Sequence, residues 1–257
     1  MPVDPLPGIV PDWAATGVGA LMTTRAGGVS RAPWDTLNLG DAVGDDPLAV
    51  AENRRRLALA IGVPVVYLRQ VHGARVVHID ASDASRAPIE ADAAVTDAAG
   101  VACAVQVADC LPVLFAAPGG RAVGAAHAGW RGLAAGVVER TLERVAALAG
   151  CARADVVSWL GPCIGPLRFE VGADVLRGFG VDPLRDASPR FAPRRRPDGQ
   201  WRWLCDLPGL ARDRLAAAGA GPVGGGHGCT VEDRSAFFSY RRDGVTGRHV
   251  AAVWRRG

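Results

Sequence analysis

Strand-like and helical segments alternate along this chain, and the alternation limits the possible folds more than any other feature. Three apolar segments separated by turns, residues 101–108, 112–117 and 121–127, are typical of β-strands. Residues 133–148 then carry apolar side chains at helical spacing with charged residues opposite them, which predicts a helix with one buried face. Because 49% of the residues are hydrophobic, the chain can bury a substantial core. We therefore expect an α/β or α+β fold with large sheets.

The rest of the chain continues this pattern. Asp46-Pro47 and Gly62 are start and stop signals for a helix between them, and Gly27-Gly28 predicts a sharp turn after a strand. Further strands are expected at 18–24, 63–68, 74–79, 95–96, 155–160, 201–205, 237–240 and 248–254, and further helices at 171–179 and 207–218. Residues 181–200, which are rich in Arg and Pro, are expected to form an exposed, mobile loop, and residues 224–228 a flexible one. We find no repeat and no domain boundary, so residues 1–257 are expected to form a single domain.

All 29 cationic side chains are arginines, because the sequence contains no lysine. This excludes a Schiff-base lysine and the lysine of a P-loop, so any bound anion must use arginine or backbone N–H groups. The formal net charge is only +3, and acidic residues are interleaved with the arginines. A nucleic-acid partner is therefore not expected.

The expected location is the cytoplasm. The first ten residues lack the features of a signal peptide, and no apolar segment is long enough to span a bilayer. Six cysteines in a chain of 257 residues without a signal peptide are typical of reduced thiols. We expect neither a membrane partner nor disulfides, and a monomer is favoured.

Two of the five histidines and one cysteine are candidates for a metal site. His72, Cys110 and His127 each lie where a predicted strand meets a turn, and such positions can converge in space. Two imidazoles and a thiolate are suitable zinc ligands, and three protein ligands leave a fourth position open for water or substrate. The alternative is a buried cysteine with two hydrogen-bonded histidines. His78, His227 and His249 are expected to be structural or exposed.

Sequence motifs over nearly the whole chain resemble those of the YfiH/YlmD-like family. Proteins of this family were first described as polyphenol oxidases with a laccase domain and are now described as purine nucleoside phosphorylases. The segments that carry the resemblance are Thr24–Ser30, Leu37–Gly40, Gln70–Gly73, Ala91–Ala93, Val107–Pro112, His127–Gly132, Gly161–Pro166 and Phe238–Gly244. The resemblance implies a single α/β domain in which layers of helices flank a β-sandwich.

The resemblance also implies a cofactor and an activity. His72, Cys110 and His127 correspond to the zinc ligands of the family, and copper could occupy the site in vitro. The implied reaction is phosphorolysis of adenosine, inosine and S-methyl-5′-thioadenosine, with some adenosine deamination, so purine nucleosides and phosphate are the expected partners. The family often has cysteines after Gly165-Pro166, where this chain has Leu167-Arg168, so Cys163 is not expected to belong to a metal pair.

Further residues are assigned to the expected chemistry. His72 and Cys110 are candidate catalytic residues together with Asp109, which could transfer a proton, orient a metal ligand or simply cap a turn. For phosphate we predict Arg25, with Asn38 as a hydrogen-bonding partner and Arg131 as second choice. The guanidinium group matches oxyanion geometry, and the Gly27-Gly28 turn lets the backbone approach a ligand.

Three other functions are compatible with the same residues. A copper polyphenol oxidase is disfavoured, because a multicopper cluster needs more than five histidines and the only methionines are Met1 and Met22. Cys110 could instead be the nucleophile of an amidase or another hydrolase, activated by a histidine. Some relatives are described as editing factors in peptidoglycan synthesis, which is a third possibility.

Overall fold

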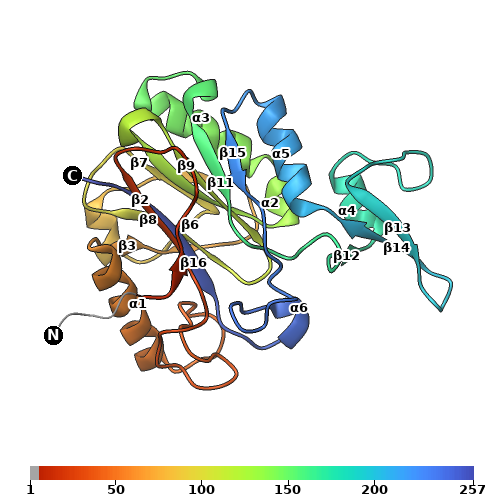
Figure 1. Ribbon diagram of the computed structural model, residues 1–257, viewed down its shortest axis with the longest axis horizontal. Coiled ribbons are helices and arrows are strands. Elements are labelled where there is room, and N and C mark those ends of the chain that lie inside the picture. The colour runs from red at the N-terminus through yellow and green to blue at the C-terminus, as the bar shows by residue number, and fades with distance from the viewer. Residues whose placement is uncertain (1–5) are drawn as a thin grey trace.

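Two large β-sheets form the centre of the molecule (Figure 1), and the computed structural model describes residues 6–257. The five-stranded sheet contains, in spatial order, β1 (Gly8–Ile9), β2 (Val18–Thr23), β16 (His249–Arg255), β8 (Ala102–Val107) and β3 (Val65–Val66). The six-stranded sheet contains β15 (Val223–Gly225), β11 (Val157–Leu160), β9 (Leu111–Ala116), β10 (Val123–Ala128), β7 (Ala93–Thr96) and β5 (Val76–His78). Neighbouring strands in both sheets are antiparallel, with three exceptions. The parallel pairs are β3 with β8, β15 with β11, and β5 with β7.

The inner faces of the two sheets pack on each other. Met22 on β2 and Val105 on β8 share one buried cluster with Leu114 on β9 and Ala125 on β10. Every residue of β9 and β10 is buried, since helices cover the outer face of their sheet. This double burial explains why these strands are continuous apolar segments in the sequence.

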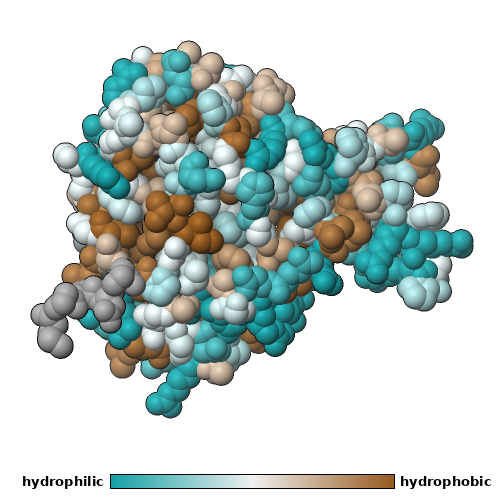
Figure 2. Space-filling model, in the orientation of Figure 1, coloured by the Kyte–Doolittle hydropathy of each residue, from teal (hydrophilic) through white to brown (hydrophobic). Residues whose placement is uncertain are grey.

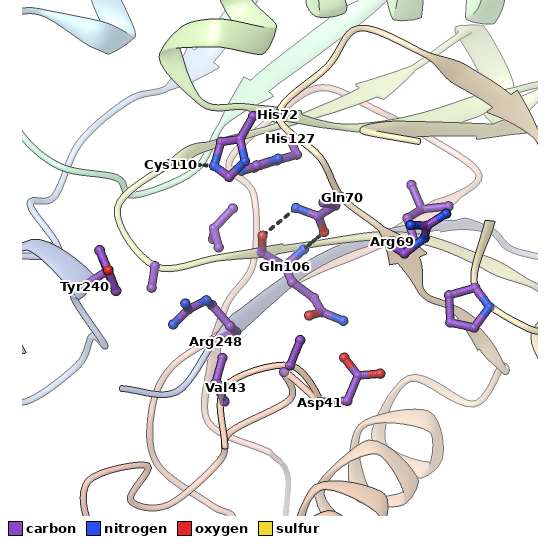
Figure 3. Close-up of a pocket in the computed structure, with 16 residues that line it drawn as sticks. Asp41, Val43, Arg69, Gln70, His72, Gln106, Cys110, His127, Tyr240 and Arg248 are labelled. Atoms are coloured by element: carbon purple, nitrogen blue, oxygen red, sulfur yellow. Dashed lines mark hydrogen bonds between the residues drawn. The ribbon is translucent and has the colours of Figure 1, made fainter. Parts of the chain in front are cut away.

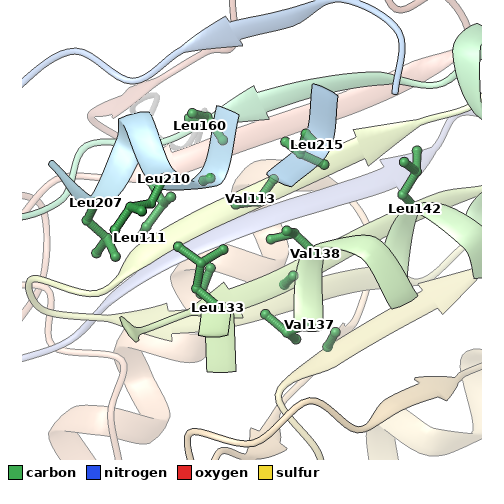
Figure 4. Close-up of a cluster of buried hydrophobic side chains, with 14 of the residues drawn as sticks. Leu111, Val113, Leu133, Val137, Val138, Leu142, Leu160, Leu207, Leu210 and Leu215 are labelled. Atoms are coloured by element: carbon green, nitrogen blue, oxygen red, sulfur yellow. The ribbon is translucent and has the colours of Figure 1, made fainter. Parts of the chain in front are cut away.

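Helices cover the outer faces of both sheets. On the six-stranded sheet, α2 (Trp130–Ala134), α3 (Val137–Ala149) and α5 (Leu207–Ala217) bury leucine and valine side chains against the strands (Figure 4). On the five-stranded sheet, α1 (Pro47–Ile61) buries Leu57 against β8 and β16. The layers of helices flanking a β-sandwich are those implied by the family resemblance, and the expected fold class is confirmed.

A smaller unit projects from this body (Figure 1, Figure 2). It contains the sheet β12 (Glu170–Val171), β14 (Trp201–Cys205) and β13 (Phe191–Arg195), together with α4 (Ala173–Gly178).

The remaining elements are the parallel pair β4 (Leu68–Arg69) and β6 (Ile89–Glu90), helix α6 (Tyr240–Asp243), and 3-10 helices at Ala81–Ser85, Pro118–Gly120 and Arg153–Asp155. Within residues 6–257 we find no helix with the length and apolar character needed to cross a membrane.

The start and stop signals of α1 act as expected. The Asp46 side chain accepts a hydrogen bond from the backbone N–H of Leu48, and Pro47 occupies the first helical position. Gly62 ends the helix with φ of 77°, a left-handed conformation that disfavours most other residues. The predicted bounds of this helix, 47–61, are confirmed.

The predicted helix at 133–148 is wrong in its continuity. Helix α2 ends at Ala134 and α3 begins at Val137, because Gly136 between them has φ of 90°. The apolar spacing continues across this break, since Leu133 and Val137 both contact the same core. Spacing alone therefore did not reveal the interruption. The expected helix at 171–179 likewise begins only at Ala173 and follows the short strand β12.

Three other sequence predictions are corrected by the structure. Part of the predicted loop 181–200 is the strand β13, which tolerates Pro193 because it lies at a sheet edge and pairs only with β14. Part of the predicted loop 224–228 belongs to β15, which pairs with β11. The predicted strand 237–240 is absent, and α6 begins there instead, where the Ser239 hydroxyl accepts a hydrogen bond from the backbone N–H of Arg242.

Candidate metal centre and its pocket

The structure brings His72, Cys110 and His127 together (Figure 3). One potential ligand atom from each lies within 4.8 Å of the others, and Sγ of Cys110 is 3.8 Å from Nε2 of His72. His127 lies on β10, whereas His72 follows β4 and Cys110 lies in the turn between β8 and β9. The sequence predicted that these three strand-to-turn positions converge, and they do.

Asp92 connects the two histidines. Its carboxylate accepts a hydrogen bond from Nδ1 of His127 at 2.8 Å and from the backbone N–H of His72 at 2.9 Å. It also accepts the backbone N–H groups of Val71 and Gly73 at 3.1 and 2.7 Å. These bonds fix the 71–73 turn, in which His72 has φ of 60°, and leave Nε2 of His127 free to bind a metal.

The surroundings of Cys110 favour its thiolate form. Burial opposes ionisation of this thiol, but the charges of His127 and His72 and their hydrogen bonds outweigh burial and lower the pKa of Cys110 to about 6. For His127, burial disfavours the charged form, yet Cys110 and Asp92 raise its pKa to about 9. Burial would also raise the pKa of Asp92, but the hydrogen bonds from His127 and Gly73 hold it below its usual value. A thiolate is the form that binds a metal or acts as a nucleophile.

The donor set and the space around it fit one metal ion. A tetrahedral zinc ion, with Zn–S of about 2.3 Å and Zn–N of about 2.0 Å, places its ligand atoms roughly 3.3–3.6 Å apart. The separation of 3.8 Å between Cys110 and His72 is close to this value. Gly129 makes the space available, because a Cβ atom there would lie 2.9 Å from Sγ of Cys110 and 3.0 Å from Cδ2 of His72.

The candidate ligands His72, Cys110 and His127 line a pocket of about 870 Å³. Around the pocket, the side-chain amide of Gln70 forms two hydrogen bonds with the backbone of Gln106, at 2.8 and 2.7 Å. Figure 3 shows the Gln106 side chain extending away from this contact, and Arg248 lies between Tyr240 and the loop that carries Val43. The pocket is therefore lined by the three candidate metal ligands together with amide, aromatic and cationic groups.

Asp109 lies beside the centre but is bonded to the C-terminal part of the chain. It is buried, with φ of 89°, and its two carboxylate oxygens accept hydrogen bonds from the Thr230 hydroxyl and the backbone N–H of Arg241, both at 2.6 Å. Of the roles considered from the sequence, this geometry favours that of positioning the Cys110 turn relative to α6. Asp109 is not among the residues that line the pocket, so its carboxylate does not face that space.

The three residues predicted to bind phosphate are not brought together at the pocket. The Arg25 guanidinium group is bonded to Asp35, including an ion pair of 3.0 Å, and to the backbone oxygen of Arg234. Arg131 is exposed and stacks on Trp130. Asn38 is fully buried and supports the loop that begins at Gly40.

The other three histidines lie away from this centre. His249 is buried and accepts a hydrogen bond from the backbone N–H of Phe238, and burial lowers its pKa to about 3. His78 is paired with Asp97 at the surface, and His227 is exposed. Among residues 6–257, His72, Cys110 and His127 are the one group of such side chains close enough to hold a metal ion.

The sequence and the fold of this chain are similar to those of known proteins. Residues 19–256 match the family described as "Multi-copper polyphenol oxidoreductase laccase". The chain belongs to this family. The similar solved structures include a Neisseria meningitidis protein, 45% identical with a TM-score of 0.88, which covers 97% of this chain and 99% of that one. Another is YlmD of Geobacillus stearothermophilus, 34% identical with a TM-score of 0.85 over 98% and 100% of the two chains.

The curated relatives include proteins named purine nucleoside phosphorylases. One from Pseudomonas aeruginosa is 47% identical, with 96% of this chain and 97% of the relative covered. YfiH of Escherichia coli is 45% identical, with 96% and 98% covered.

Sequence reasoning assigned no role to four residues of the site, namely Gln106, Asp92, Gly129 and Arg248. Asp92 and Gly129 lie in segments that carry the family resemblance, which is the signal in the sequence that could have marked them. No local pattern marks Gln106 or Arg248: Gln106 lies within β8, and Arg248 lies directly before β16 and far in sequence from His72, Cys110 and His127.

Proposed function

We propose that this protein is a zinc-dependent purine nucleoside phosphorylase. Its substrates would be adenosine, inosine and S-methyl-5′-thioadenosine with phosphate, and adenosine deamination would be a side activity. The observation that carries the proposal is the His72, Cys110 and His127 group in a pocket of about 870 Å³, in a chain 45–47% identical to proteins named purine nucleoside phosphorylases. A pocket of this size is large enough for a nucleoside.

Zinc is the metal that this donor set favours. Two imidazoles and one thiolate leave an open position, and a bound ion would supply Lewis-acid polarisation of an oxygen atom at the reacting centre. The family description names several copper ions, but residues 6–257 provide one group of three such ligands. A site for a single ion therefore supports the phosphorylase proposal better than a multicopper oxidase.

Gln106 is the proposed contact for the purine base. Its backbone is fixed by two hydrogen bonds with the Gln70 side chain, one accepted and one donated, and its own side-chain amide has no protein partner among the described residues. A glutamine amide offers one acceptor and two donors, the pattern that pairs with the polar edge of a purine. Tyr240, also in the pocket lining, offers an aromatic surface for stacking.

A second candidate function follows from the charge state of Cys110. Its lowered pKa, the neighbouring His127 and the carboxylate of Asp92 behind that histidine are the elements of a cysteine nucleophile with its base. This geometry supports the cysteine hydrolase or amidase considered from the sequence. Such an enzyme would work without metal and would form a covalent thioester with its substrate.

The test is the release of free base from a panel of nucleosides, measured with and without phosphate. We expect the wild-type protein to release base only with phosphate, and His72→Ala to lower the rate at least 100-fold. His78→Ala is the matched control, because His78 is an exposed histidine paired with Asp97 outside the pocket. Base release that is unchanged in His72→Ala would refute the proposal. Activity that persists in metal-free protein and is lost with a thiol-directed inhibitor would favour the hydrolase.

A further inference from the structure

Arg248 is the one cation of the described pocket lining that has no carboxylate partner. The other arginine of the lining, Arg69, is paired with Glu90 at 2.9 Å, and the lining carboxylate Asp41 is paired with Arg54 at 3.2 Å. The Arg248 side chain forms its hydrogen bonds to the protein only through Nη1, which donates to the backbone oxygens of Thr246 and Gly247 at 3.0 Å each. Its Nε and Nη2 edge therefore has no protein acceptor within residues 6–257.

The protein holds Arg248 in place before any ligand binds. Oδ1 of the buried Asn38 accepts the backbone N–H groups of Arg248 and Gly40, both at 2.9 Å. Gly40 leaves room for the arginine stem, because a Cβ atom there would lie 2.7 Å from Cγ of Arg248. The guanidinium group then lies 5.8 Å from the centre of the Tyr240 ring (Figure 3). Such preorganisation lowers the entropic cost of binding.

The electrostatic setting of Arg248 favours an anion. Burial disfavours its charged form and lowers its pKa, while Cys110, Asp109 and Tyr240 act in the opposite direction. The first two of these groups already have partners of their own, since Cys110 faces the histidines and Asp109 accepts two hydrogen bonds. A partly desolvated guanidinium without a paired carboxylate gains most from a ligand that brings negative charge.

We propose that Arg248, positioned by Asn38 and Gly40, is the phosphate-binding residue of the pocket. Two phosphate oxygens would accept from the Nε and Nη2 edge in the bidentate geometry that arginine favours. This inference rests on the phosphorylase function proposed above and names the site of its second substrate. It also gives Asn38 the role of positioning Arg248, whereas Asn38 was predicted from the sequence as a hydrogen-bonding partner in a phosphate site at Arg25.

The phosphate held there would be the nucleophile. One of its oxygens forms a bond to C1′ of the nucleoside as the bond from C1′ to N9 of the purine breaks. The electron pair of the broken bond goes to the purine, which takes up the proton that monohydrogen phosphate loses. The products are ribose 1-phosphate and the free base, and no oxidant or further reactant is needed.

The test compares Arg248→Gln with the wild-type protein, both loaded with zinc. We expect the Kd for inorganic phosphate, measured by calorimetry without nucleoside, and the KM for phosphate to rise roughly 10- to 100-fold, the usual effect of losing a charged hydrogen bond. The KM for inosine should change less than about threefold. Arg75→Gln is the control, since it removes one positive charge from an exposed arginine outside the pocket lining, and its phosphate Kd should equal that of the wild type.

The binding measurement separates this inference from the proposed function. If no nucleoside is cleaved but phosphate binds through Arg248, the phosphorylase proposal fails and the anion site stands. If the wild-type protein does not bind phosphate, or Arg248→Gln binds it with the wild-type Kd, the inference is overturned even where phosphorolysis occurs. Should the glutamine variant not fold, Arg248→Lys keeps the charge but loses the bidentate edge. A phosphate Kd several-fold weaker supports the inference, and an unchanged Kd refutes it.

Discussion

Replacing Asp92 by asparagine should damage both the stability of the protein and its affinity for metal. The buried carboxylate accepts four hydrogen bonds, from the backbone N–H groups of residues 71, 72 and 73 and from Nδ1 of His127. An asparagine has one acceptor oxygen, so in either orientation its NH2 group faces two donors that lose their acceptor. At about 1–3 kcal/mol for each buried unsatisfied donor, the loss is about 2–6 kcal/mol. This is a large fraction of the total stability of a protein domain.

The assay has two parts. Urea unfolding of Asp92→Asn with a chelator present gives the loss of stability, and competition with a chromophoric chelator gives the zinc Kd, which we expect to rise about 10- to 100-fold. Asp97→Asn is the matched control, since Asp97 pairs with an exposed histidine, His78, and should cost less than about 1 kcal/mol. A zinc Kd and an unfolding free energy equal to those of the wild type would refute the role given to Asp92.

Three further predictions concern the same centre. Gly129→Ala should weaken zinc binding at least tenfold, because its Cβ atom would lie within 3.0 Å of two ligand side chains; wild-type zinc content would contradict this. In metal-free protein, the rate of Cys110 alkylation should rise with pH around a midpoint near 6, the lowered pKa of this thiol, and His127→Ala should move the midpoint upward; a midpoint near 9 in the wild type would refute the pairing. Asp109→Ala removes the acceptor of the Thr230 hydroxyl and of a backbone N–H group, so unfolding in urea should show a loss of about 2–5 kcal/mol; a loss below about 0.5 kcal/mol would contradict its positioning role.

Local signals in the sequence were sufficient for parts of the fold. Helix α1 was predicted to the residue, because a capping aspartate, a proline at the first helical position and a terminal glycine act within a few residues of each other. The helical spacing of 133–148 gave the correct buried face but concealed the break at Gly136. The strand β13 has one buried residue, Phe191, and such a strand leaves almost no alternating pattern to detect.

The site was only partly predictable, because some of its residues are marked by their own sequence segment, whereas others are positioned by contacts between distant segments. His72, Cys110 and His127 could be selected, since few residues of those types exist and each lies at a strand-to-turn position. The supporting contacts join distant segments. Asn38 and Arg248 are 210 residues apart, and no property of either segment alone indicates that they meet.

For phosphate, local reasoning selected Arg25 on the strength of its glycine turn. That turn exists, with φ of 96° at Gly27, but the Arg25 guanidinium group already forms an ion pair with Asp35. Whether an arginine is free to bind a ligand depends on its tertiary partners, which the sequence does not display.

The most direct test of the central proposal is a zinc titration of chelator-treated protein, in which phosphate-dependent formation of hypoxanthine from inosine is followed. We predict that metal-free protein is inactive and that activity rises linearly and saturates at about one zinc ion per chain, bound by His72, Cys110 and His127. Full activity without metal, or activity restored by copper and not by zinc, would contradict the proposal.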